Sequence, residues 1–101
     1  MTNACVNIDG SRCLMTMEGH ATGSETVCAG VSAIVYALSG YLLNAGEHLE
    51  KVIRNELESG SACISCTGDE CVAAAFRMAG IGLAQIARQF PDYLSVFFSD
   101  E

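Results

Sequence analysis

The segment from Val27 to Leu43 is the most apolar part of the sequence and constrains the fold more than any other. Its larger apolar side chains recur three or four residues apart, which predicts a helix. With about 17 residues and several glycines and serines, the segment predicts a buried helix rather than a membrane span. Most of the other positions are small, so neighbouring elements can approach closely, and we expect this helix to be central. The predicted apolar stripe is Val27, Val31, Ile34, Val35, Leu38, Tyr41 and Leu42.

A hairpin is predicted before this helix, because Asp9-Gly10 separates two stretches of alternating apolar residues. A turn at these two residues would pair Val6 with Cys13. It would also send Cys5 and Cys13 to opposite faces, which disfavours a disulfide between them. The face predicted to be buried comprises Ala4, Val6, Ile8, Cys13, Met15 and Met17.

The rest of the chain predicts three more strands and a second helix. Residues 49–58 suit a helix or a strand by their spacing, and the turn signal that follows slightly favours a hairpin. The further predicted elements are a strand at 62–66, a helix from Thr67-Gly68-Asp69 to Pro91, and a strand at 93–98. The order β-β-α-β-β-α-β predicts an α+β fold, with a mainly antiparallel sheet and two packed helices in a single domain over 1–101.

Composition excludes some classes of partner. The net charge is −7 and the five lysines and arginines are scattered, whereas nucleic-acid binding needs clustered cations. No export signal is evident, so we expect a cytoplasmic protein whose six cysteines are reduced. The acidic balance favours solubility and permits a basic partner.

Cys28 and His20 are candidates for nucleophilic chemistry. A thiol attacks as thiolate, which is favoured by the first turn of a helix and by a nearby histidine. Ser24, or Thr22 in a capping box with Glu25, would begin the helix shortly before Cys28. From the residues alone, Cys28 is either such a nucleophile or an inert buried thiol.

Other polar side chains have weaker patterns. Cys63, Cys66 and Cys71 are an alternative thiol–metal module, but a strand would send Cys63 and Cys66 to opposite faces. His48 has no cysteine or acid at a recognisable spacing and is expected to be solvated, as are Arg77 and Arg88. We predict no metal and no cofactor.

Two short motifs resemble those of a known family. Gly19-His20-Ala21 followed by Val27-Cys28-Ala29-Gly30-Val31-Ser32-Ala33 resembles the GHA…VCAAVSA signature of the ribosomal-processing cysteine proteases, the Prp or YsxB-like family. The acidic turn at 56–60 and the segment IARQFPDYL also look like this family, so the resemblance covers nearly the whole chain. It implies an α+β fold with residues 50–58 as a strand.

The resemblance also implies a reaction. His20 would be the general base and Cys28 the nucleophile, with Gly19, Glu25 and Ser32 in supporting positions. Glu25 would either orient His20 or satisfy the helix start, and we favour the second role. Family members remove an N-terminal extension from a large-subunit ribosomal protein, cutting after a phenylalanine-containing motif; phage structural proteins are also known as substrates, and members are generally homodimers.

The sequence departs from the family between the two motifs. The family usually has about eleven residues between its histidine and cysteine, whereas here only Ala21 to Val27 intervene. A shorter segment leaves less chain to close over a peptide. The second hypothesis is therefore a homologue that binds a peptide or a phage protein without cutting it.

Overall fold

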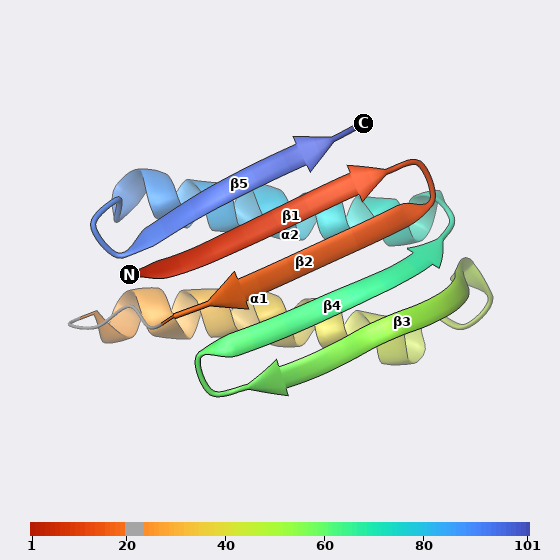
Figure 1. Ribbon diagram of the computed structural model, residues 1–101, viewed down its shortest axis with the longest axis horizontal. Helices are drawn as coiled ribbons and strands as arrows, with labels where there is room; N and C mark the ends of the chain where they lie inside the picture. The colour runs from red at the N-terminus through yellow and green to blue at the C-terminus, as the bar shows by residue number, and fades with distance from the viewer. Residues whose placement is uncertain (20–23) are drawn as a thin grey trace.

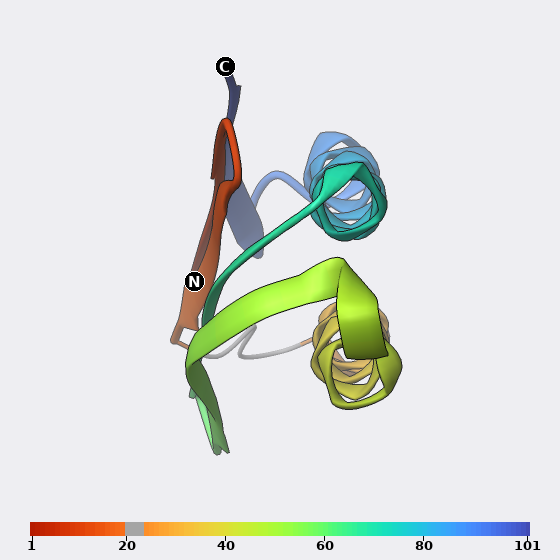
Figure 2. The same cartoon turned by 90° about the vertical axis from the view of Figure 1, so that its right-hand side faces the viewer.

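A mixed sheet forms one layer of the protein, with strand order β3-β4-β2-β1-β5 in the computed structural model, which describes residues 1–19 and 24–101. Two helices form the second layer, on one face of this sheet (Figures 1 and 2). The strands are β1 (Thr2–Asp9), β2 (Arg12–Glu18), β3 (Leu49–Glu58), β4 (Ser61–Gly68) and β5 (Leu94–Asp100). The helices are α1 (Glu25–Asn44), the short 3-10 helix η1 (Gly46–His48) and α2 (Glu70–Gln89).

The predicted α+β fold and the order β-β-α-β-β-α-β are confirmed. Strands β1 and β2, β2 and β4, and β3 and β4 pair antiparallel, while β1 and β5 pair in parallel. The segment that suited either a helix or a strand is β3, and its turn into β4 is centred on Gly60, which has a φ of 75°.

The register predicted for the first hairpin is wrong. Val6 pairs with Met15 rather than with Cys13, and Asp9 pairs with Arg12, so the turn lies at Gly10 and Ser11. A shift of two residues leaves every side chain on its predicted face, because side chains alternate along a strand. The predicted face is therefore buried or packed on the core, and Cys5 lies on the opposite face from Cys13.

Helix α1 is not central. One stripe of it is buried against the sheet, while Tyr36 is 64% exposed and Leu43 is 78% exposed. Helix α2 packs beside α1 in the same layer, and its buried residues include Phe76 and Leu83 (Figure 2). Small residues of α1 allow α2 to pack closely against it. A Cβ at Gly30, for example, would lie 3.2 Å from Cδ1 of Ile86.

Both helices are long and apolar enough to cross a membrane by length and composition. This is weak evidence for a span, since core helices of soluble proteins meet the same criterion. A third of each apolar window is buried within the fold.

Two polar residues predicted to be solvated have partners. Arg77 of α2 donates to Asp100 of β5, with Nε 2.6 Å from Oδ2, and this hydrogen bond lowers the pKa of Asp100. His48 lies 2.8 Å, through Nδ1, from Oδ2 of Asp69, and the contact raises the pKa of His48. Neither pairing had a signal in the sequence, because the partners are more than twenty positions apart.

Candidate active site

Helix α1 begins with a neutral cap. Ser24 has extended backbone angles, and its Oγ accepts a hydrogen bond from the N–H of Val27 at 3.2 Å. Ser24 is therefore the N-cap, while the competing position Thr22 lies outside the described residues. Glu25 is the first helical residue and is exposed, so its carboxylate stabilises the positive end of the helix.

Cys28 lies on the exposed side of the helix start. Its N–H donates to the carbonyl of Ser24 at 3.2 Å, which closes the first turn. Side chains of a helix lean toward its N-terminus, so the thiol lies over the turn formed by Glu25 and Thr26. By helix geometry the N–H groups of these two residues have no acceptor within the helix.

A cleft of about 450 Å³ runs between α1 and the β3–β4 turn. Cys28, Ser32 and Tyr36 line it from successive turns of α1. Polar side chains line the cleft on both sides, from α1 and from the β3–β4 turn. The other lining residues are Met17, Val35, Leu57, Glu58, Ser59, Gly60, Ser61 and Ala62.

Gly19 connects the end of β2 to this cleft. Its N–H donates to the carbonyl of Gly60 at 2.8 Å, and Gly60 belongs to the turn that lines the cleft. The φ of Gly19 is +94°, and a Cβ there would lie 2.5 Å from the carbonyl oxygen of Met1. Only glycine fits this position without strain, which gives the first residue of the Gly19-His20-Ala21 motif a structural reason.

The chain matches a family of known proteins over most of its length. Residues 1–95 match the family of cysteine protease Prp. The chain belongs to this family. No match was found among curated proteins.

Solved structures share the fold of this Prp family member. The S. aureus ribosomal processing protease Prp with a covalently linked product peptide has a TM-score of 0.78 at 15% identity, covering 97% of this chain and 99% of that one. The same protease with a substrate peptide has a TM-score of 0.70 at 15% identity, with the same coverage. SMU.848 from Streptococcus mutans has a TM-score of 0.74 at 19% identity, covering 100% of this chain and 96% of that one.

The structure brings together part of the set of residues predicted for the site. Cys28 and Ser32 line the same cleft, and Gly19 is bonded to the turn on its opposite side. Glu25 lies at the helix start, and His20 lies outside the described residues. Sequence reasoning did not give the β3–β4 turn a role in the site, although the resemblance included its acidic residues.

The remaining thiols do not gather around Cys28. Cys63 and Cys66 lie on opposite faces of β4, as predicted, and Cys66 is buried. Burial raises the pKa of the Cys66 thiol to about 11, and its neighbour across the strand pair is Cys13. Burial also raises the pKa of Cys13. These two thiols are core residues and poor nucleophiles.

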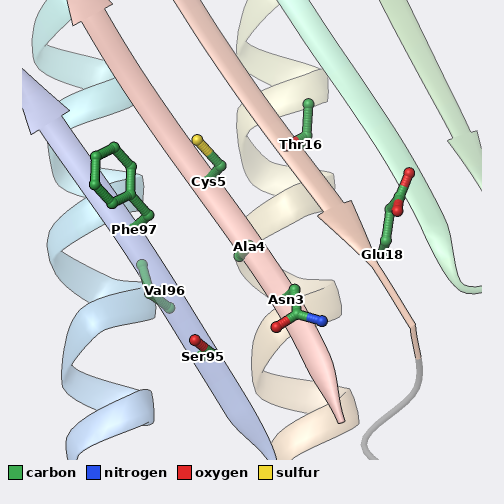
Figure 3. A pocket seen from close by; sticks show the side chains of 8 residues that line it. All are labelled: Asn3, Ala4, Cys5, Thr16, Glu18, Ser95, Val96 and Phe97. Atoms are coloured by element: carbon green, nitrogen blue, oxygen red, sulfur yellow. The ribbon is translucent and has the colours of Figure 1, made fainter.

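A second hollow lies on the open face of the sheet, away from both helices (Figure 3). Cys5, Phe97 and Glu18 point outward there, and Ala4 and Val96 form its floor. The helix start with Cys28 belongs to the layer on the opposite face. This hollow therefore does not extend the candidate active site.

Proposed function

We propose that this protein is a ribosomal-processing endopeptidase that removes a short N-terminal extension from a large-subunit ribosomal protein, using His20 as base and Cys28 as nucleophile. The observation that carries the proposal is Cys28 at the start of α1, facing a peptide-sized cleft in a chain of the Prp family. The S. aureus protease of the same fold was solved with a substrate peptide and with a covalently linked product peptide.

The reaction follows from these groups. His20 takes the proton of Cys28, and the sulfur attacks the scissile carbonyl carbon, forming a C–S bond. The N–H groups of Glu25 and Thr26 then donate to the developing oxyanion in this proposal. When the tetrahedral intermediate collapses, the C–N bond breaks and the amine leaves with the proton from His20. Water then hydrolyses the thioester and restores the thiol.

The cleft suggests what the substrate offers. Met17, Val35 and Leu57 form apolar walls that would accept an apolar side chain such as phenylalanine. Glu58 contributes a carboxylate to the rim, and the chain as a whole carries a charge of −7. An extension that carries a basic residue beside its apolar residue therefore fits this cleft best.

A peptide-cleavage assay tests the proposal. A peptide that spans the extension and the first residues of the mature ribosomal protein is incubated with the protein, and the products are identified by mass spectrometry. Cys28→Ala should abolish cleavage, whereas Cys71→Ala, which removes an exposed thiol from the start of the other helix, should leave it unchanged. His20→Ala should slow cleavage by about 100-fold or more. Equal cleavage by wild type and Cys28→Ala would rule out Cys28 as nucleophile.

The second candidate function is peptide binding without cleavage, with a ribosomal or a phage structural protein as partner. The shortened segment between His20 and Cys28 favours it. Alkylation of Cys28 discriminates the two functions: a rate that already reaches its plateau well below pH 8 supports the protease. A rate that rises only above pH 8, together with saturable binding of an uncut peptide, supports the binding protein.

We also propose that the protein forms a homodimer through the helix layer and works in the cytoplasm. An apolar groove lies between α1 and α2, where Met78 is 77% exposed and Ile81 is 50% exposed. Its lining has no charged residue, so two copies of this acidic chain can meet there without placing like charges together. The groove is lined by Ile34, Ala37, Leu38, Tyr41, Ala75, Met78, Ala79, Ile81, Gly82 and Gln85.

The molar mass in solution tests this surface. Ile81→Asp should convert a dimer into a monomer in light scattering after size exclusion. Ile53→Asp is the matched control, because Ile53 is similarly exposed, at 47%, but lies on β3. A dimer that survives Ile81→Asp would place the interface elsewhere.

A further inference from the structure

The start of α2 lies at the opposite end of the molecule from the start of α1 (Figure 1). Three side chains of different chemistry converge there. His48 comes from η1, Asp69 is the N-cap of α2, and Cys71 lies in its first turn. One nitrogen, one oxygen and one sulfur from these residues lie within 4.8 Å of one another. The alternative metal site considered from the sequence combined Cys71 with Cys63 and Cys66 instead.

The backbone holds this cluster in place. The N–H of Asp69 donates to the carbonyl of His48 at 3.0 Å, which fixes η1 against the helix start. Gly68 permits this approach, since a Cβ there would lie 2.8 Å from the same carbonyl oxygen. Oδ1 of Asp69 accepts the N–H of Cys71 at 2.9 Å, so Oδ2 is the oxygen that faces His48.

We propose that His48, Asp69 and Cys71 bind a divalent transition-metal cation, with zinc as the best fit. Thiolate, imidazole and carboxylate are the donors that zinc takes in proteins, whereas magnesium and calcium take oxygen donors. The charges of the thiolate and the carboxylate balance the two charges of the ion. Three protein ligands leave a fourth tetrahedral position for water.

Metal binding requires only local adjustment. Zinc lies about 2.0 to 2.3 Å from each donor, so the widest-spaced of the three atoms must close by roughly 1 Å. Asp69 and Cys71 are exposed and His48 is half-buried, so their side chains can rotate without disturbing the core. As the bonds to the ion form, the thiol proton of Cys71 passes to solvent, and His48 binds as a neutral imidazole that keeps one proton on its other ring nitrogen. Oδ1 of Asp69 can keep its bond to the helix.

The bound ion would join η1 to the first turn of α2. It binds the folded chain and has no preformed site in the unfolded one, so it stabilises the fold by linkage. This role is independent of the proposed cleavage at Cys28, and its test needs no substrate.

Cobalt(II) titration tests the site, because a cobalt–thiolate bond gives an absorption band in the near ultraviolet. This band disappears when zinc replaces the cobalt ion. The full-length protein, stripped with chelator, is titrated as wild type, Cys71→Ser, Cys63→Ser and Cys28→Ala. The band should appear at one equivalent in wild type, Cys63→Ser and Cys28→Ala, and disappear in Cys71→Ser. Zinc affinity should fall more than about tenfold in His48→Gln.

Each other outcome overturns the proposal. No saturable band in wild type would show that the three donors do not bind a metal. A band that persists in Cys71→Ser but is lost in Cys28→Ala would place the metal at the candidate active site. Circular dichroism of Cys71→Ser shows whether that variant is folded, and a zinc-dependent rise in Tm that Cys71→Ser retains would also count against the site.

Discussion

Replacing Gly19 with alanine should lower both the stability of the fold and the rate of peptide cleavage. At Gly19 the φ of +94° is strained for any other residue, and the new Cβ would lie 2.5 Å from the carbonyl oxygen of Met1. The strained φ costs about 1 kcal/mol, and the forced backbone displacement costs about 1 to 3 kcal/mol more. We therefore expect Gly19→Ala to lower the free energy of unfolding by about 2 to 4 kcal/mol.

The displacement should also reach the site. Thr2 is held by the bond of its N–H to the carbonyl of Tyr93 at 3.0 Å, and its side chain is buried, so the N-terminus cannot simply move away. The strain then falls on Gly19 and its bond to Gly60, which lies in the turn that lines the cleft. Peptide cleavage should fall at a temperature at which the variant is still fully folded.

Two control variants separate the cost of the positive φ from the cost of the clash with Met1. Gly10 has a φ of +60° with nothing within 4 Å of its Cβ position, so Gly10→Ala should cost only the strain, about 1 kcal/mol. Gly40 lies in α1 with the same open space, so Gly40→Ala should stabilise the protein by about 0.5 to 1 kcal/mol. Urea unfolding measures all three, with intact mass confirming that Met1 is retained. A Gly19→Ala variant no less stable than Gly10→Ala would refute the proposed clash.

Three further outcomes are expected. Iodoacetamide at pH 8 should label exposed Cys71 but leave Cys66 unlabelled until the protein unfolds, because burial raises the pKa of Cys66 to about 11. Mass spectrometry of the digest measures the two labelling rates, and equal rates would contradict the prediction. Arg77 lowers the pKa of Asp100 below its ordinary 3.8, so their hydrogen bond stabilises the fold above pH 3.8 and is lost as the pH falls through the lowered value. The difference in Tm between wild type and Asp100→Asn should therefore shrink below pH 3.8. Glu58→Gln should raise KM several-fold for a peptide with a basic residue and leave a neutral peptide unaffected, and an equal change for both peptides would remove Glu58 from recognition.

The fold could be predicted from the sequence wherever a local pattern decides it. Alternation along 4–8 and 13–17 predicted which face of the first hairpin is buried, and that prediction survived a wrong register because the error was two residues. The same spacing rules could not show which side of α1 contacts α2. Small residues at most positions of α1 permitted contacts on several sides, and the choice among them depends on the other helix.

The candidate site was predictable in its motif and not in its surroundings. Helix capping predicted that Ser24 or Thr22 begins the helix, and the resemblance selected Cys28. The β3–β4 turn is distant from Cys28 in the sequence and is brought near α1 by the folding of the sheet, so no local pattern indicated that it lines the cleft. The contact of His48 with Asp69 was missed for the same reason, since strands β3 and β4 separate them along the chain.

The two helix starts carry exposed thiols in similar positions, yet their caps suit them to different chemistry. Ser24 caps α1 with a neutral oxygen, so the cap itself adds no negative charge near Cys28, although Glu25 carries one in the same turn. Asp69 caps α2 with a carboxylate that also accepts the N–H of Cys71, so a negatively charged group lies beside that thiol. The proposed divalent cation would bind both groups. The difference in cap residue thus supports the two separate proposals, Cys28 as a nucleophile and Cys71 as a metal ligand.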